Sequence, residues 1–225
     1  MIHALARPLT LVAGLALVLA ACTATGASSP PSEAPTSVAG SPGVASGCPT
    51  AQPPALAAGE TRDVTITTDR GAIVVHVEAD LSPIAAGNFV ALADCGWYDG
   101  VVFHRVVPRF VIQGGDGENG RSPNVDPTTV GQGGPGYTIK DEPVTATYQR
   151  GVVAMARTQA PDSVGSQFFI VLDDEARGSL AQANTYQIIG SVTSGIETVD
   201  AIAAAADAEN PTDPVVMTDV SVATP

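Results

Sequence analysis

The sequence predicts a mainly β domain in which short strands form a closed barrel or a sandwich, with two helices packed against it. Three observations support this fold class. Short apolar runs recur along the chain, separated by loops rich in glycine or proline. Two segments have the spacing of an amphipathic helix. Hydrophobic residues make up 44% of the 225 residues and aromatic residues only 4%, so the core of a single domain must consist mainly of Val, Ile, Leu and Ala. Of the two architectures, we predict the barrel.

The folded region begins with a predicted β-hairpin. From Asp63 onward, apolar residues alternate with polar ones on both sides of a turn at residues 68–71. The apolar members are Val64, Ile66, Ile73, Val75 and Val77. A period of two places these side chains on one face, which predicts two half-buried strands.

Two helices are expected. Ser82 and Pro83 supply an N-cap residue and a first-turn proline for a helix that ends at about Asp94, and Ser194 is expected to cap the second helix. Each helix has an apolar face: Ala85, Phe89 and Leu92 in the first, and Ile196, Val199, Ile202 and Ala203 in the second.

The remaining strands are predicted from short apolar runs bounded by glycine-rich or proline-rich loops. Between the helices these runs are residues 101–103, 110–113, 151–156, 167–172 and 186–192. Residues 215–222 form the last predicted strand.

The first 22 residues have the features of a secretory signal. Arg7 precedes an apolar stretch that begins at Leu9, and small residues come directly before Cys22. The apolar stretch of about a dozen residues is shorter than the roughly 20 that span a bilayer, so a transmembrane helix is not expected. The sequence LAAC at residues 19–22 resembles the lipobox of bacterial lipoproteins, whose cysteine becomes an acylated N-terminus after cleavage. We therefore predict a signal peptide at 1–21 and a lipid anchor at Cys22.

The next segment, residues 22–58, consists mainly of Ala, Ser, Pro, Thr and Gly, with almost no charge. Such a segment cannot bury enough apolar surface to fold. We expect a flexible, disordered tether at 22–58 and a single domain at 59–225. The protein would be extracytoplasmic and anchored to the bacterial cell membrane by its lipid.

Two cysteines remain, Cys48 and Cys95. Export to an oxidising compartment favours a disulfide between them, and two unpaired thiols are the alternative. They are too few and too far apart for a zinc site. No metal or cofactor is expected.

Charge and motifs exclude several classes of function. The formal net charge is -13 with only 10 basic residues, which argues against a nucleic-acid partner. Residues 131–136 fit G-x-G-x-x-G, but Pro135 and the residues after it do not open a helix, so a dinucleotide site is rejected. His104 has no nucleophile motif to serve, so we expect a structural, hydrogen-bonded histidine rather than a catalytic triad.

The stretch FHRVVPRFVIQGGD, residues 103–116, resembles the signature of the cyclophilin family of peptidyl-prolyl isomerases. NFVALADCGWYDG before it, and GQGGPGYTIKDE and MARTQAPDSVGSQFFIVL after it, are similar to family blocks in the same order. The likeness covers about residues 61–222. It implies a closed, eight-stranded antiparallel barrel capped by two α-helices.

The resemblance also implies roles for individual residues. Arg105 matches the family's catalytic arginine, and Gln113 matches a residue that hydrogen-bonds the substrate backbone. The walls of the proline pocket would be Phe110, Val111 and Phe169. The groove for the residue before proline would be bordered by Ala156 and Gln167.

Three further positions near the pocket depart from common family patterns. Arg157 stands where many members have Asn, Leu180 where some have Trp, and Tyr186 where others have His. The loop at residues 158–165 is one residue longer. These departures leave the preference for the residue before proline open.

The predicted function is peptidyl-prolyl cis–trans isomerisation, which assists the folding of exported proteins. Rotation about X-Pro has a barrier of about 18–20 kcal/mol and breaks no bond. A donor over the proline nitrogen stabilises the twisted transition state, which suits an arginine among hydrophobic residues without a nucleophile. The alternatives are a cyclophilin-fold binding module or chaperone with little turnover, and a purely structural envelope protein. We expect a monomer whose partners are proline-containing segments of exported proteins.

Overall fold

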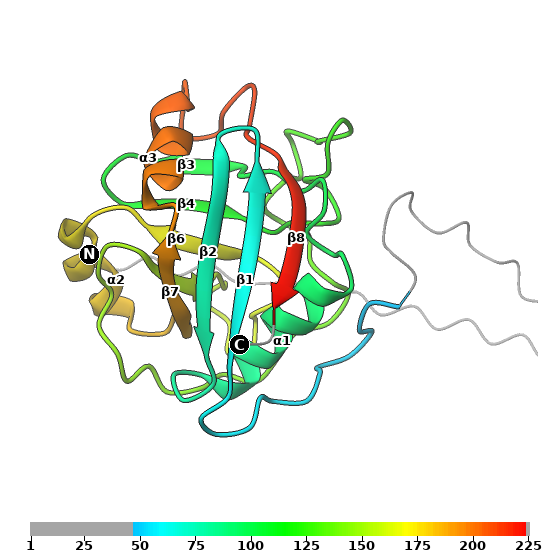
Figure 1. The fold of residues 1–225 in the computed structure, drawn as a ribbon, viewed down its shortest axis with the longest axis vertical. Helices are drawn as coiled ribbons and strands as arrows, with labels where there is room; N and C mark the ends of the chain where they lie inside the picture. The colour runs from blue at the N-terminus through cyan, green and yellow to red at the C-terminus, as the bar shows by residue number, and fades with distance from the viewer. Residues whose placement is uncertain (1–46, 224–225) are drawn as a thin grey trace, which may run out of the picture. The chain divides into compact units, whose positions relative to one another are not determined.

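The computed structural model describes residues 47–223, which form one antiparallel sheet with helices packed against it (Figure 1). The predicted signal peptide, Cys22 and most of the predicted tether lie outside the described residues. The sheet has eight strands in the order β3-β4-β6-β5-β7-β2-β1-β8. Their bounds are β1 Thr61–Thr68, β2 Gly71–Glu78, β3 Arg105–Val107, β4 Val111–Gly114, β5 Val152–Met155, β6 Phe168–Val171, β7 Ile188–Ser194 and β8 Met217–Ala223. A mainly β fold with eight antiparallel strands is confirmed.

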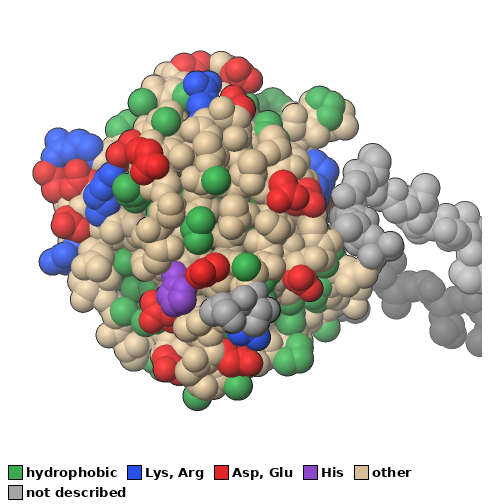
Figure 2. Space-filling view, viewed as in Figure 1, with side chains coloured by type: hydrophobic (Ala, Val, Ile, Leu, Met, Phe, Trp, Pro, Cys, Tyr) green, Lys and Arg blue, Asp and Glu red, His purple; other side chains and the backbone are tan. Residues whose placement is uncertain are grey.

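The hairpin of β1 and β2 follows the predicted alternation. Val64 pairs with Val75 and Ile66 with Ile73 in the antiparallel ladder, and all four side chains are fully buried. The residues between them are partly exposed on the other face of the hairpin. Figure 2, drawn from the same side as Figure 1, shows acidic side chains scattered over the surface of the domain. The period-two pattern therefore fixes which face of the hairpin reaches the core.

The sheet curls into a half-barrel, and the predicted closed barrel is not confirmed. β3 and β8 stand at the two ends of the strand order, and within residues 47–223 no ladder joins them. The segments that precede these two strands do meet: Val102 and Val216 form an isolated bridge, and the Phe103 amide donates to the Val215 carbonyl at 2.9 Å. The predicted strand at 101–103 is accordingly reduced to bridges, and β3 begins only at Arg105.

Three α-helices occur in the described part of the chain, not the predicted two. α1 (Pro83–Asp94) and α3 (Ile196–Ala205) were expected and lie near opposite ends of β1 and β2 in Figure 1. α2 (Arg177–Ala183) follows a short 3-10 helix, η1 (Asp174–Ala176). α2 has no apolar stripe, because Leu180 is its one buried residue.

The helix starts also differ in detail from the prediction. Gly195, with φ of 81°, is the N-cap of α3 in place of Ser194. Ser82 is the N-cap of α1, but its side chain makes no capping hydrogen bond. Instead, the Glu142 carboxylate accepts hydrogen bonds from the amides of Ile84 and Ala85, both at 2.9 Å. A carboxylate distant in sequence thus satisfies the free amides of the first turn.

The core has two parts. The larger one lies between α1 and the sheet and is centred on a fully buried aromatic cluster in which Phe168 meets Phe89, Tyr98 and Phe103 edge-on. The smaller one lies beside β4, β5 and β6 and contains Val111, Tyr148, Val152, Ala154, Phe169, Val171, Ala176, Leu180 and Ile188. This second cluster supports the site described below.

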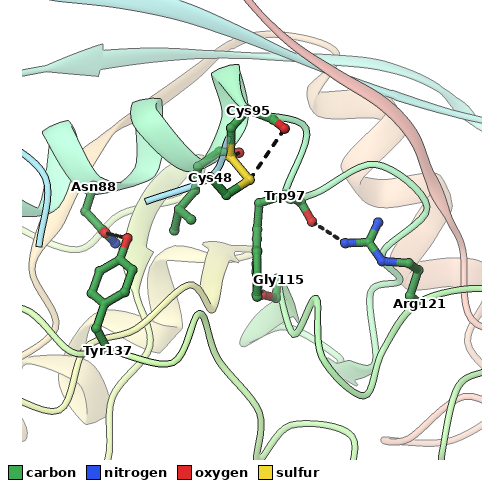
Figure 3. Close-up of a disulfide and its surroundings, with 8 residues drawn as sticks. Cys48, Asn88, Cys95, Trp97, Gly115, Arg121 and Tyr137 are labelled. Atoms are coloured by element: carbon green, nitrogen blue, oxygen red, sulfur yellow. Dashed lines mark hydrogen bonds between the residues drawn. A yellow bond between two sulfur atoms is a disulfide. The ribbon is translucent and has the colours of Figure 1, made fainter. Parts of the chain in front are cut away.

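Residues 47–58, expected to end the tether, contact the domain. Cys48 is joined to Cys95, just after α1, by a disulfide (Figure 3). Farther along, the Leu56 amide donates to the Pro83 carbonyl at 3.1 Å, and the Lys140 amide donates to Gln52 Oε1 at 2.9 Å. Within the described residues, contacts with the domain are therefore already present at Cys48, before the expected boundary at residue 59. Among the helices of residues 47–223, none combines the length and the hydropathy needed to cross a membrane.

Candidate active site

Three neighbouring strands align the polar and apolar parts of the site. Arg105 on β3 stands directly opposite Gln113 on β4, and Gln113 stands opposite Phe169 on β6. Residues that face each other in an antiparallel ladder project to the same side of the sheet. The register therefore places a guanidinium, an amide and an aromatic ring in one row.

This row opens into a cavity of about 250 Å³. Its lining contains nine of the ten residues predicted to act in catalysis or substrate binding: Arg105, Phe110, Val111, Gln113, Ala156, Arg157, Phe169, Leu180 and Tyr186. The tenth, Gln167, lines a neighbouring cavity of about 740 Å³, which shares Gln113, Ala156 and Arg157 with the first. The predicted residues, which run from Arg105 to Tyr186 in the sequence, thus line two adjoining cavities.

The smaller cavity has an apolar floor. Val111, Phe169 and Leu180 are buried, with at most 4% of each residue exposed. The Phe169 ring meets the Tyr186 ring edge-on, at a centroid distance of 5.4 Å and an angle of 85°. A rigid floor beside a few polar groups is the usual form of a pocket that holds a small apolar ring.

A chain of hydrogen bonds fixes the polar side of the site. Arg105 Nη1 donates to Gln113 Oε1 at 3.5 Å, and Gln113 Nε2 donates to Gln167 Oε1 at 3.0 Å. Gln167 Nε2 in turn donates to the carbonyl oxygens of Gly131 and Gly133, at 3.0 and 2.9 Å. The glycine-rich loop at residues 131–133 thereby orients the side-chain amides of Gln167 and Gln113. Through these two amides it is connected to the Arg105 guanidinium.

Glu209 is a second partner of Arg105 that the sequence analysis missed. Arg105 Nε donates to Glu209 Oε1 at 2.8 Å, across 104 positions of sequence. The arginine side chain is 34% exposed and the glutamate side chain 59% exposed. No local pattern in the sequence could have paired two residues so far apart.

Asp116, the last residue of the stretch 103–116, supports the loop beside the site and was not predicted to do so. Its carboxylate is fully buried and accepts four backbone hydrogen bonds. Oδ1 accepts from Glu118 and Asn119 at 3.1 and 2.9 Å, and Oδ2 accepts from Gly131 and Gly133 at 2.7 and 3.0 Å. Asp116 thus holds the loop to which Gln167 donates. The available signal was an acid between a predicted strand and a glycine-rich loop.

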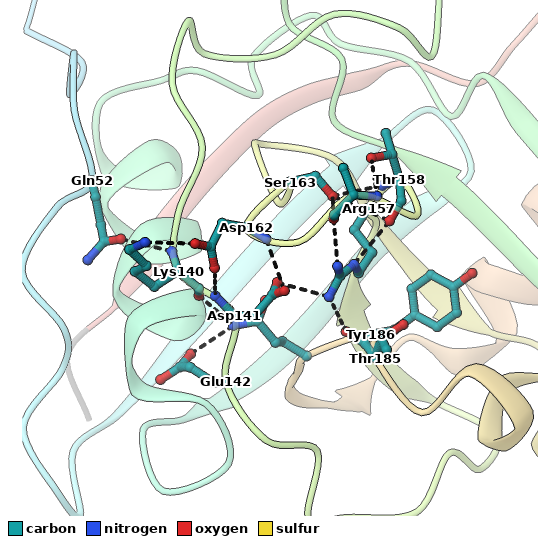
Figure 4. A network of polar contacts seen from close by, with 12 residues as sticks. Gln52, Lys140, Asp141, Glu142, Arg157, Thr158, Asp162, Ser163, Thr185 and Tyr186 are labelled. Carbon is teal, nitrogen blue, oxygen red and sulfur yellow. Dashed lines mark hydrogen bonds and ion pairs between the residues drawn. The ribbon is translucent and has the colours of Figure 1, made fainter.

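Arg157 lines both cavities, but its guanidinium is engaged by the protein (Figure 4). It pairs with Asp141 Oδ1 at 2.9 Å and donates to the carbonyls of Thr158 and Ala160 at 3.1 and 2.7 Å. Only 8% of the side chain is exposed. Arg157 therefore shapes the rim between the cavities and connects the loops on its two sides.

A reciprocal contact in Figure 4 fixes the loop at residues 158–165. The Asp141 amide donates to the Asp162 carboxylate, and the Asp162 amide donates to the Asp141 carboxylate, both at 2.9 Å. Lys140 Nζ also donates to Asp162 at 2.7 Å, which holds the pKa of Asp162 below its ordinary value. These contacts hold the 158–165 loop against Lys140 and Asp141.

His104 is almost fully buried, and no group in the part of the chain that the structure describes makes the hydrogen bond that was predicted for it. Neither ring nitrogen has a hydrogen-bond partner among residues 47–223, and burial lowers the pKa of the ring. The His104 ring lies against the 131–133 loop, since a Cβ added to Gly131 would come within 3.3 Å of Nε2.

Among the described residues, no cluster of three or more His, Cys, Asp or Glu side chains could hold a metal ion.

Comparisons with known proteins agree with this geometry. The family model described as cyclophilin type peptidyl-prolyl cis-trans isomerase matches residues 63–222. A probable peptidyl-prolyl cis-trans isomerase of Brucella abortus is 37% identical over 158 residues, which cover 69% of this chain and 79% of that protein. Peptidyl-prolyl cis-trans isomerase B of Bacillus subtilis is 41% identical over 127 residues, covering 54% and 78%.

Solved structures share the fold. A cyclophilin type peptidyl-prolyl cis-trans isomerase of Cryptosporidium parvum superposes with a TM-score of 0.61 at 30% identity, covering 73% of this chain and 99% of its own. A second structure of that protein was determined in the presence of the dipeptide Ala-Pro, with a TM-score of 0.60. Since the family model spans nearly all of the described domain and the relatives are similar to it in sequence and fold, the chain belongs to the cyclophilin family of peptidyl-prolyl cis-trans isomerases.

Proposed function

We propose that this isomerase accelerates X-Pro rotation in exported polypeptides outside the cytoplasm, while a lipid on Cys22 holds it at the bacterial cell membrane. In this proposal the chain is divided into a signal peptide at 1–21, a tether that runs from Cys22 to the disulfide at Cys48, and the isomerase domain. The secretory pattern and the sequence before Cys22 support the location. One observation supports the residue roles: Arg105 and Gln113 stand side by side above an apolar pocket.

The apolar floor would hold the proline ring. Phe110, Val111 and Phe169 all line the cavity, and Val111 and Phe169 belong to the buried cluster behind it. Burial of the ring binds the planar and the twisted peptide alike, so it supplies affinity and orientation rather than acceleration. A ring held in this way leaves the chain before it as the part that turns.

Arg105 would supply the acceleration. As the X-Pro bond twists, the proline nitrogen loses conjugation and regains a lone pair that can accept a hydrogen bond. A guanidinium fixed beside the ring meets this lone pair only in the twisted state, so it lowers the barrier without tightening ground-state binding. No proton transfer and no covalent intermediate is required.

Gln113 would hold the substrate backbone on one side of the rotating bond. Its amide is already oriented by Arg105 and Gln167, so little side-chain entropy is lost when substrate binds. Ala156, Gln167, Arg157, Leu180 and Tyr186 would border the space for the neighbouring residues, with Arg157 acting through its shape.

A protease-free assay tests this function directly. The purified protein is added to a short X-Pro peptide that relaxes from cis to trans, and the relaxation rate is measured against enzyme concentration. We expect a linear increase whose slope Arg105→Ala lowers at least about 100-fold and Arg109→Ala leaves unchanged. Arg109 is the matched control because it is a neighbouring, exposed arginine that pairs with Glu175 away from the cavity. Tight peptide binding without acceleration would favour the binding-module or chaperone alternative.

A further inference from the structure

Arg105, on the edge strand β3, pairs with an acidic side chain from the loop that precedes the other edge strand, β8. Glu209 lies in the segment between α3 and β8, whereas Arg105 begins β3. The two ends of the strand order therefore meet at this ion pair, where Arg105 Nε donates to Glu209 Oε1 at 2.8 Å. The contact uses the Nε edge of the guanidinium and leaves the Nη groups for the cavity side.

The backbone of Glu209 is fixed to the same strand. Its carbonyl accepts a hydrogen bond from the Val106 amide at 2.7 Å, one residue after Arg105. A residue held to β3 through its backbone and to Arg105 through its side chain cannot drift independently of the site. Both contacts lie on one short stretch of β3, so together they define where the carboxylate stands relative to the guanidinium.

The segment that carries Glu209 is itself constrained. Asp207 accepts hydrogen bonds from the Thr212 amide at 3.0 Å and from the Thr212 hydroxyl at 2.6 Å, which closes the segment around Glu209. Pro211, within the stretch that Asp207 and Thr212 close, and Val215, after it, line one small cavity together with Phe103 and Val106. The carboxylate is therefore presented by a closed loop, although its side chain is more than half exposed.

Stability does not explain such an arrangement. Ion pairs between exposed side chains add little to folding free energy, because water screens them and both side chains lose entropy. Transition-state stabilisation differs, since it depends on donors that are oriented before the reaction. An unrestrained arginine has many rotamers. Glu209 on one side and Gln113 on the other reduce them to an arrangement in which the guanidinium lines the cavity.

We infer that Glu209 is a positioning residue, which orients the Arg105 guanidinium toward the proline nitrogen by accepting the hydrogen bond from Nε. The inference rests on the proposed role of Arg105. It requires an acceptor at this point rather than a negative charge. The substitution Glu209→Gln would keep an acceptor oxygen for Nε, whereas Glu209→Ala would leave Nε free.

The test compares kcat and KM for an X-Pro peptide in the full chain. We expect Glu209→Ala to lower kcat about tenfold and to leave KM within about twofold, because orientation rather than ring burial is lost. Glu209→Gln should retain at least half of kcat. Glu175→Ala is the matched control, since it removes a similarly exposed carboxylate from an arginine outside the cavity, and it should leave kcat unchanged. All three variants should melt within about 3 °C of the wild type.

A double-mutant cycle separates this inference from the proposed function. In the Arg105→Ala background, Glu209→Ala should have no further effect on kcat. If Arg105→Ala itself retains turnover, the proposed role of Arg105 fails. If Arg105→Ala loses turnover but Glu209→Ala keeps or raises kcat, the positioning role is wrong and the carboxylate restrains the arginine. Equal losses in Glu209→Gln and Glu209→Ala would also overturn it.

Discussion

Arg105 and Gln113 occupy facing positions of the β3–β4 ladder, and the guanidinium of one donates a hydrogen bond to the amide oxygen of the other at 3.5 Å. This distance is long for a hydrogen bond, so we expect a substrate group to compete with the contact. Two adjacent strands thus define the spacing between the proposed transition-state donor and the proposed backbone anchor.

Arg105→Ala should slow isomerisation about 10²- to 10³-fold, the usual cost of removing a transition-state donor. Arg105→Lys should recover little of this loss, because an ammonium lacks the planar fork that meets Glu209 and Gln113 together. Peptide affinity measured by calorimetry should change much less, since ring burial is intact. Near-normal turnover in Arg105→Ala, with an unchanged melting curve, would show that Arg105 is not the catalyst.

Asp116→Asn should lower the free energy of unfolding by about 3 kcal/mol, because an amide NH₂ would face backbone N–H groups that now donate to a carboxylate. Turnover should fall as well, since the Gly131–Gly133 loop orients Gln167 and Gln113. Denaturant unfolding and the peptide assay measure the two effects. Asp126→Asn, on an exposed turn, is the control and should cost less than about 1 kcal/mol. Equal losses in both variants would contradict the special role of Asp116.

Stability should fall in mild acid because of His104. Burial lowers the pKa of this imidazole below its ordinary value of 6.5, so between the two values the unfolded chain binds a proton that the folded chain does not. The contribution of neutral His104 to the free energy of unfolding is therefore complete above pH 6.5, and it decreases as the pH falls toward the folded-state pKa. Its slope is at most about 1.4 kcal/mol per pH unit. The free energy of unfolding, measured from about pH 7.5 to about pH 5, should depend less steeply on pH in His104→Gln than in the wild type. An identical slope in the two proteins would assign the pH dependence to other groups.

Loss of the disulfide should destabilise the domain without disabling it. Cys48 and Cys95 are 47 positions apart, and a closed loop of this length contributes about 3–4 kcal/mol in the chain-entropy description. Cys48→Ala with Cys95→Ala should therefore unfold at lower denaturant concentration, while turnover under native conditions is retained because neither residue lines the cavity. Alkylation of both thiols in the folded, exported wild type would show that the pair is not formed.

Cys22→Ser should release the protein from the membrane fraction, because serine offers no thiol for acylation. Fractionation of cells, with mass measurement of the mature N-terminus, tests this expectation. Cys48→Ser provides the control, since it also removes a cysteine and should leave the protein membrane-bound. A Cys22→Ser protein that stays in the membrane with the same mass modification would contradict the proposed anchor.

Periodicity predicted the parts of the fold that depend on local pattern. The alternation from Val64 to Val77 gave the hairpin, and the spacing of Ala85, Phe89 and Leu92 gave α1. α2 was not predicted, because Leu180 is its one buried residue and a single residue produces no apolar stripe at helical spacing. Closure of the barrel could not be decided from sequence, since it depends on whether distant strands pair.

The residues of the pocket were predicted by family resemblance, and the structure brings them together at the two cavities. Their supports were not predicted. Glu209 reaches Arg105 from 104 positions away, and Asp116 binds backbone amides of a loop that folds back over it. Arg157 was expected to bind substrate, yet its donors meet acceptors from three loops. Such partners become visible only when loop conformations are known.

The bond between Cys48 and Cys95 also determines how the domain would respond to a mechanical load. Tension applied to the chain before Cys48 would pass through the sulfur atoms to the end of α1. Residues 49–94, which include β1, β2 and α1, would be bypassed. β1 lies between β2 and β8 and would otherwise be the first strand pulled out of the sheet. If the proposed tether holds the domain from before Cys48, tension on it would therefore not unravel the closed loop of residues 49–94 while the disulfide is intact.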